Sequence, residues 1–146
     1  MKSIKLLALL AIVVAFVSCD ALKQATNTTT TGAVFSLNGK WQLTSTGMQS
    51  NALVGSIVTV SPLVSEGRLT TVSNNSQCYR QDDIKWKSIK SNNAGGYTIS
   101  NLLSNCNSGS LNYVPAVITV VSNNEISLSG QNVSGQQSTE SWTRLQ

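Results

Sequence analysis

The sequence predicts an all-β domain built as a single antiparallel, up-and-down barrel of eight strands. Eight short runs of β-forming residues follow one another from Phe35 to the end of the chain, separated by turns rich in glycine, asparagine and serine. No run after residue 18 has a helical period. Consecutive strands joined by short connections pair with their neighbours, and closure into a barrel removes both exposed edges.

Alternation of apolar and polar residues predicts the first four strands. The first carries Trp41 on its apolar parity, the second has valines such as Val58 at every second position, and the third is entered through Gly67. In the fourth, Trp86 alternates with Lys85, which is therefore expected on the polar, outward face. These strands are FSLNGKWQLTS, ALVGSIVTVSP, GRLTTVSN and DDIKWKSIK, at 35–45, 52–62, 67–74 and 82–90.

Turn signals separate the last four strands. The fifth follows the turn string SNNAGG and alternates Tyr97 and Ile99 with polar residues. The sixth is apolar on both parities, and SNNE forms the turn into the seventh. The last strand carries Trp142 and Arg144 near the end of the chain. These strands are GGYTISNLL, LNYVPAVITVVS, EISLSGQ and TESWTRLQ, at 95–103, 111–122, 125–131 and 139–146.

Residues 1–18 have the features of a secretory signal peptide. Two lysines precede LLALLAIVVAFVS, which carries no charge and is too short to span a bilayer comfortably. Cys19 follows in FVSCD. FVSCD resembles the lipobox of bacterial lipoproteins, although Phe16 and Val17 depart from its usual leucine and small residues. The resemblance implies acylation of Cys19 and anchoring in the bacterial cell envelope, with the outer membrane as the expected location.

An ordinary secretory signal, cleaved near Cys19, is the alternative, and it would leave a secreted or periplasmic protein. In either case residues 19–33, which include four consecutive threonines, are polar and lack apolar periodicity. Such a composition indicates a flexible linker. The barrel domain is therefore expected over residues 34–146.

Cys78 and Cys106 remain for a disulfide. Both lie in turn-like surroundings, and disulfides persist outside the cytoplasm. Closing a loop of this length would restrict the unfolded chain. Two free thiols are the alternative, and a metal site is a weaker third choice. Without any histidine in the chain, two cysteines cannot complete a typical zinc shell unless carboxylates join them.

Composition argues against catalysis and against nucleic-acid binding. The chain has no histidine, and its six acidic residues are scattered, so no catalytic group and no cofactor site is predicted. Removing Lys2 and Lys5 with the signal peptide leaves eight of the ten basic residues against six acidic ones, a net charge of +2. No basic patch dense enough to follow a phosphate backbone remains.

The segment LNGKWQL resembles the first-strand motif of the calycins, the lipocalin-like and avidin-like barrels, which open with G-x-W. Here the motif is Gly39 and Trp41. In lipocalins an arginine near the end of the barrel packs across that tryptophan, and Arg144 stands at the matching place. The resemblance implies a lipocalin-like barrel whose base is closed by these three residues. The first strand is also similar to that of META-type bacterial lipoproteins.

Two functions follow as expectations. A lipocalin-like domain implies a small apolar ligand, or an envelope protein partner. Trp86, Tyr97 and Tyr113, together with Trp142, are the candidate residues to line its mouth. In the alternative these aromatic residues fill the barrel, because eight strands enclose little more than their own side chains. The protein would then be a structural or accessory lipoprotein without a small-molecule site.

Overall fold

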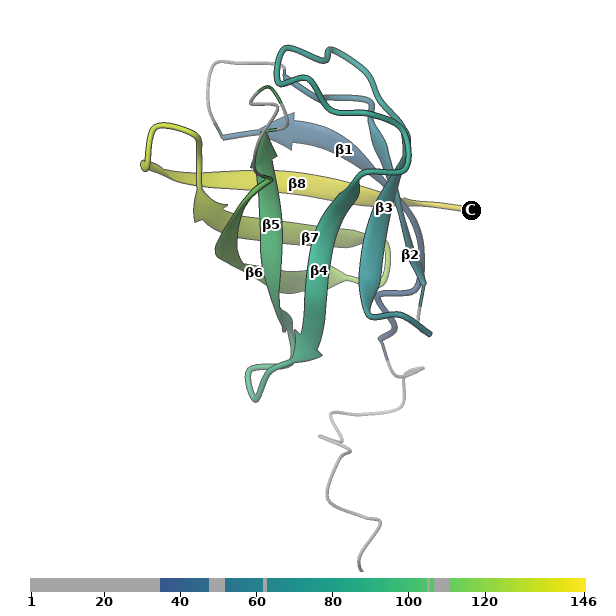
Figure 1. Ribbon diagram of the computed structural model, residues 1–146. Coiled ribbons are helices and arrows are strands. Elements are labelled where there is room, and N and C mark those ends of the chain that lie inside the picture. Colours follow the sequence, from purple (N-terminus) through teal and green to yellow (C-terminus); the bar gives the residue numbers. More distant parts are fainter. Residues whose placement is uncertain (1–34, 48–51, 62, 105, 107–110) are drawn as a thin grey trace, which may run out of the picture. The chain divides into compact units, whose positions relative to one another are not determined.

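The chain folds into a closed barrel of eight antiparallel strands in sequence order, which confirms the predicted fold class (Figure 1). The computed structural model describes residues 35–47, 52–61, 63–104, 106 and 111–146. Within them no residue is helical, so no helix there is long and apolar enough to cross a membrane. The strands are β1 Gly39–Thr46, β2 Ile57–Ser61, β3 Glu66–Thr71, β4 Ile84–Ser91, β5 Tyr97–Ser104, β6 Asn112–Ser122, β7 Glu125–Gln131 and β8 Gln137–Leu145.

The first two strands begin four and five residues later than the alternation predicts, the largest such differences. Residues 35–38 precede β1 without entering the sheet. The strand expected from residue 52 begins only at Ile57, because residues 52–55 form a turn in which Leu53 has a φ of 66° and Gly55 a φ of 91°. Both values lie in the left-handed region, which strands do not use. The apolar pattern of this segment therefore reflects burial in a turn, where Leu53 joins the core.

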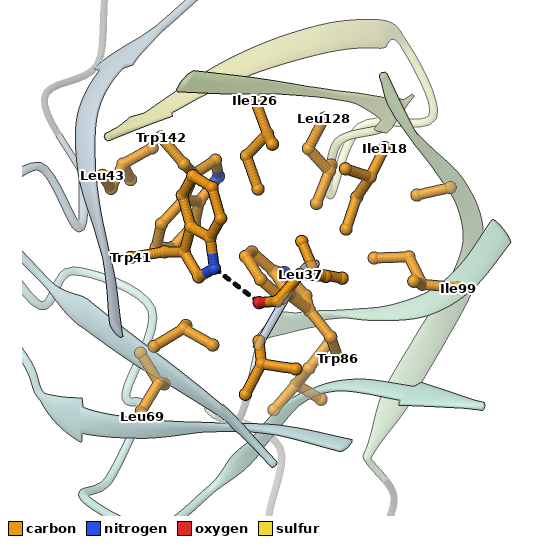
Figure 2. Close-up of a cluster of buried hydrophobic side chains, with 14 of the residues drawn as sticks. Leu37, Trp41, Leu43, Leu69, Trp86, Ile99, Ile118, Ile126, Leu128 and Trp142 are labelled. Atoms are coloured by element: carbon orange, nitrogen blue, oxygen red, sulfur yellow. Dashed lines mark hydrogen bonds between the residues drawn. The ribbon is translucent and has the colours of Figure 1, made fainter. Parts of the chain in front are cut away.

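Side chains occupy the interior of the barrel (Figure 2). The indoles of Trp41, Trp86 and Trp142 are all 0 % exposed. Trp86 and Trp142 meet edge to face with ring centres 4.9 Å apart, a favoured geometry for aromatic pairs. Close packing leaves no room for one more carbon at Gly67, where a Cβ would lie 2.8 Å from Val58 Cγ1. Buried aromatic and aliphatic side chains from the strands form this core.

The barrel has two distinct ends. At the base, β1 and β3 begin while β2 and β8 finish, and the described chain enters there at Phe35. At the mouth, the connections are 47–56, 72–83, 105–111 and 132–136. The connection 72–83, between β3 and β4, arches over the mouth at the top of Figure 1.

Candidate functional site

Arg144 closes the base of the barrel. Its guanidinium carbon lies 4.2 Å from the centre of the Trp41 ring, and the two residues are partners in the β1–β8 pairing. The guanidinium donates hydrogen bonds to three backbone carbonyls: Asn38 O at 2.5 Å, Asn123 O at 3.0 Å, and Ser36 O. These bonds tie the segment before β1 and the β6–β7 turn to the last strand. The arrangement makes this end a structural closure.

Gly39 leaves space for that closure. Its φ is +119°, which L side chains rarely adopt, and a Cβ there would lie 3.0 Å from Arg144 Nη1. Trp41 is fixed from the other side, because its Nε1 donates a 2.7 Å hydrogen bond to Leu37 O. The structure therefore brings together the three residues expected at the base.

The aromatic residues expected at the mouth do not share a cavity. Trp86 lies in the core against Trp142. Tyr97 starts β5 at the base, where its ring centre is 6.2 Å from that of Phe35. Tyr113 lies under Lys87 Nζ, 3.6 Å from the ring centre, and donates a hydrogen bond to the backbone.

A disulfide joins Cys78 to Cys106, as predicted. It links the 72–83 connection to Cys106, which lies between β5 and β6. Tyr79, the next residue along, is held by Asn75: Tyr79 N donates to Asn75 Oδ1 at 2.8 Å, and Asn75 Nδ2 donates to Tyr79 O at 2.6 Å. The Tyr79 side chain is thereby held in a buried position, 3 % exposed.

A β-bulge turns Lys85 into the interior. Gly67 pairs with Trp86 and Arg68 pairs with Ile84, so one step along β3 corresponds to two steps along β4. Lys85 is the extra residue, and bulges of this kind redirect a side chain. It is 1 % exposed, next to the fully buried Trp86. The expectation that Lys85 faces outward is therefore wrong, because the bulge breaks the alternation on which it rested.

Lys85 and Tyr79 converge on one backbone oxygen. Lys85 Nζ donates a 2.6 Å hydrogen bond to Leu102 O, and Tyr79 Oη donates to the same oxygen at 2.8 Å. Nζ also donates to Tyr79 Oη at 3.4 Å. The carboxylate of Glu140, on β8, accepts a 3.0 Å hydrogen bond from Trp142 Nε1 and lies on the same side of the mouth. A polar cluster thus sits between the hydrophobic core and the loops.

Burial dominates the electrostatics of this cluster. It lowers the pKa of Lys85 below its ordinary value, and the negative charge of Glu140 offsets part of that effect. Burial also raises the pKa of Tyr79, and the charges of Glu140 and Asp83 raise it further. Desolvation thus favours the uncharged form of both side chains.

A cavity of about 50 Å³ adjoins the cluster. Its rim includes the exposed side chains of Gln131 and Val133, so the cavity is continuous with the surface. A water molecule takes up about 30 Å³ in the liquid, so the space would hold about two. Its inner wall consists mainly of polar side chains, from Gln77, Tyr79, Lys85, Leu103, Ser138 and Glu140.

Sequence reasoning missed this cluster. Tyr79 stands in a segment with turn character, and the bulge that redirects Lys85 has no glycine or other local signal. Of the other expected sites, Cys19 lies outside the described residues. Among the residues that are described, no group of three or more histidine, cysteine, aspartate or glutamate side chains could hold a metal ion.

Comparison of the chain with protein-family models, with curated proteins and with solved structures finds no match.

Proposed function

We propose that the chain is a lipid-anchored lipoprotein of the bacterial cell envelope, whose lipocalin-like barrel is a structural or accessory module. Close packing of the barrel interior supports the proposal that the domain is a structural or accessory module. Trp41, Trp86 and Trp142 occupy its centre with no exposed surface, and a methyl group at Gly67 would collide with Val58. A carrier of apolar ligands needs an apolar cavity that can bury most of the ligand.

The cavity at the mouth of the barrel also favours a structural or accessory module over a carrier of apolar ligands. The cavity there is lined mainly by polar groups, and its volume of about 50 Å³ is far below the roughly 300–1,000 Å³ of typical ligand pockets. A fatty-acyl chain would have to displace the core to enter. The filled-barrel alternative is therefore better supported than an apolar-ligand carrier.

The base suits attachment to a membrane anchor. The described chain enters at Phe35, whose ring lies 5.6 Å from the guanidinium of Arg144. Leu63 and Val64, in the turn between β2 and β3 at the same end, are 91 % and 56 % exposed. Exposed apolar side chains alone do not single out this end, because Leu111 and Val133 at the mouth are 51 % and 57 % exposed. The mouth, at the opposite end, remains available to an envelope partner.

Replacing Cys19 tests the anchor. The variant Cys19→Ala should move from the membrane fraction to the soluble fraction of cells that produce the full chain, because no acyl chain can be attached. As a matched control, Cys78→Ser combined with Cys106→Ser removes two cysteines but leaves the anchor, and should stay in the membrane fraction. Unchanged membrane retention of Cys19→Ala would overturn the proposal.

A further inference from the structure

The side chain of Lys85 is a buried amine whose hydrogen-bond acceptors are neutral, with the Glu140 carboxylate acting on it from β8. Within the described residues, its two hydrogen-bond acceptors are Leu102 O at 2.6 Å and Tyr79 Oη at 3.4 Å, and neither is charged. Surface lysines are normally protonated and solvated, whereas Lys85 is 1 % exposed. A buried cation without a close counter-charge is costly.

The hydrogen-bond pattern accommodates either protonation state of the amine: Nζ also lies 5.1 Å from the centre of the Tyr79 ring, a contact open to an ammonium group. An ammonium group has three N–H donors, and a neutral amine has two together with a lone pair. The Tyr79 hydroxyl donates its hydrogen bond to Leu102 O, so the hydroxyl oxygen can accept one from Lys85 Nζ. The two acceptors then match the two N–H groups of neutral Lys85. The lone pair that remains is what makes an amine a nucleophile.

A surface-connected cavity adjoins the Lys85 side chain. Lys85 forms part of its wall, and the exposed Gln131 and Val133 form part of its rim. The hydroxyl of Tyr79 and the carboxylate of Glu140 lie in the same wall and can exchange protons with a molecule bound there. Room for about two waters corresponds to a compound of two or three non-hydrogen atoms.

We propose that Lys85 is a covalent capture site for small aldehydes, which it binds reversibly as an imine. The lone pair of Nζ attacks the carbonyl carbon, and the carbonyl oxygen takes up a proton as the nitrogen loses one. The resulting carbinolamine loses its hydroxyl group, with a second proton from the nitrogen, as one molecule of water. The C=N bond replaces the C=O bond, and no oxidant or reductant is consumed. This inference does not depend on the lipid anchor.

Reductive trapping tests the proposal on the full mature chain with its disulfide intact. The protein is treated with limiting acetaldehyde and sodium cyanoborohydride at pH 7, and ethylation of each lysine is followed by peptide mapping. Lys40 and Lys90, both exposed, serve as controls within the same molecule. Lys85 should react measurably faster than either, since burial lowers its pKa and so leaves more of its amine neutral at pH 7.

Two further arms separate capture in the cavity from general lysine reactivity. Trimethylacetaldehyde, which is too bulky for the cavity, should modify Lys40 and Lys90 but not Lys85. The preference for Lys85 should decline as the pH is raised above 7 within the range where cyanoborohydride still traps the imine, since an ordinary lysine gains neutral amine about tenfold per pH unit. Glu140 and Tyr79, which face Lys85 from β8 and from the 72–83 connection, are the other titratable groups around it. Modification of Lys85 no faster than that of Lys40 and Lys90 at pH 7, or equal modification by the bulky aldehyde, would overturn the inference.

Discussion

Arg144 lies across the face of Trp41, with its guanidinium carbon 4.2 Å from the ring centre, at the seam where the last strand closes on the first. The two residues are direct partners in the β1–β8 ladder, and the guanidinium also donates to three backbone carbonyls. One side chain thus connects the closing seam, the chain entry and the β6–β7 turn.

Removing the guanidinium should weaken the barrel strongly. Arg144→Ala is expected to lower the free energy of unfolding by about 2–4 kcal/mol, because it removes charge-assisted hydrogen bonds and a cation–π contact. Arg144→Lys should recover little of this loss, since an ammonium group cannot reproduce the fork that reaches several carbonyls. Urea unfolding gives the measurement. Lys40→Ala, on the exposed face of β1, is the control and should change little; an equal loss there would contradict the role given to Arg144.

Gly39→Ala should also be destabilising, for two separable reasons. The φ of +119° disfavours any side chain, at a cost of about 1–3 kcal/mol, and the new Cβ would press on Arg144 Nη1. Gly95→Ala is a matched control, because Gly95 has a φ of +78° with nothing within 4 Å of a Cβ. A larger loss for Gly39→Ala than for Gly95→Ala in urea unfolding is the expected result. Equal losses would mean that contact with Arg144 contributes nothing.

The disulfide should stabilise the domain through its unfolded state. Closing the 28-residue separation between Cys78 and Cys106 is expected to contribute about 3–4 kcal/mol, because the bridge restricts the unfolded chain. The double variant Cys78→Ser with Cys106→Ser should lose that amount in chemical unfolding. Adding a reductant should bring the unmodified protein to the same midpoint and leave the variant unchanged. A reductant effect on the variant would refute the assignment.

Lys85→Met should stabilise the protein at neutral pH. The folded-state pKa of Lys85 is lowered by burial, so folding carries a desolvation penalty wherever the unfolded chain has a protonated lysine. Between the folded-state pKa and about pH 10.5 the unfolded state binds more protons, so the stability of the unmodified protein rises with pH. The advantage of Lys85→Met should therefore shrink across that window.

Unfolding curves at several pH values measure this effect, with the exposed Lys90→Met as a control that should show no such trend.

The titration of Tyr79 has the opposite effect on stability. Its folded-state pKa is raised, so above about pH 10 the unfolded state releases a proton that the folded state retains, and stability falls. Lys85→Met and Lys90→Met both retain Tyr79, so both variants lose stability at high pH in the same way. A constant difference between Lys85→Met and the unmodified protein at all pH values would contradict the account.

Periodicity was sufficient to predict the barrel because its inward residues repeat at every second position over most strands. Trp41 and Trp142 occupy the core as that pattern predicts. The disulfide followed from two cysteines in turns and the expected oxidising compartment. These features depend on local pattern and on composition, both of which are visible in a single sequence.

The polar cluster could not be predicted because it depends on a break in that pattern. A one-residue bulge shifts the face of every side chain beyond it, and only the pairing of β4 with β3 reveals the bulge at Lys85. Tyr79 reaches the cluster from a connection that has no period at all. Sequence alternation placed Lys85 in solvent, whereas the register places it beside Trp86 in the interior.

Native mass spectrometry of the full protein, extracted gently from membranes, tests the central claim most directly. A lipid-anchored module with a filled barrel predicts one mass: the chain that begins at Cys19, with its attached acyl chains and no further lipid-sized mass. A chain without acyl groups would contradict the anchor. A lipid-sized molecule that travels with the folded protein and leaves on unfolding would contradict the filled interior.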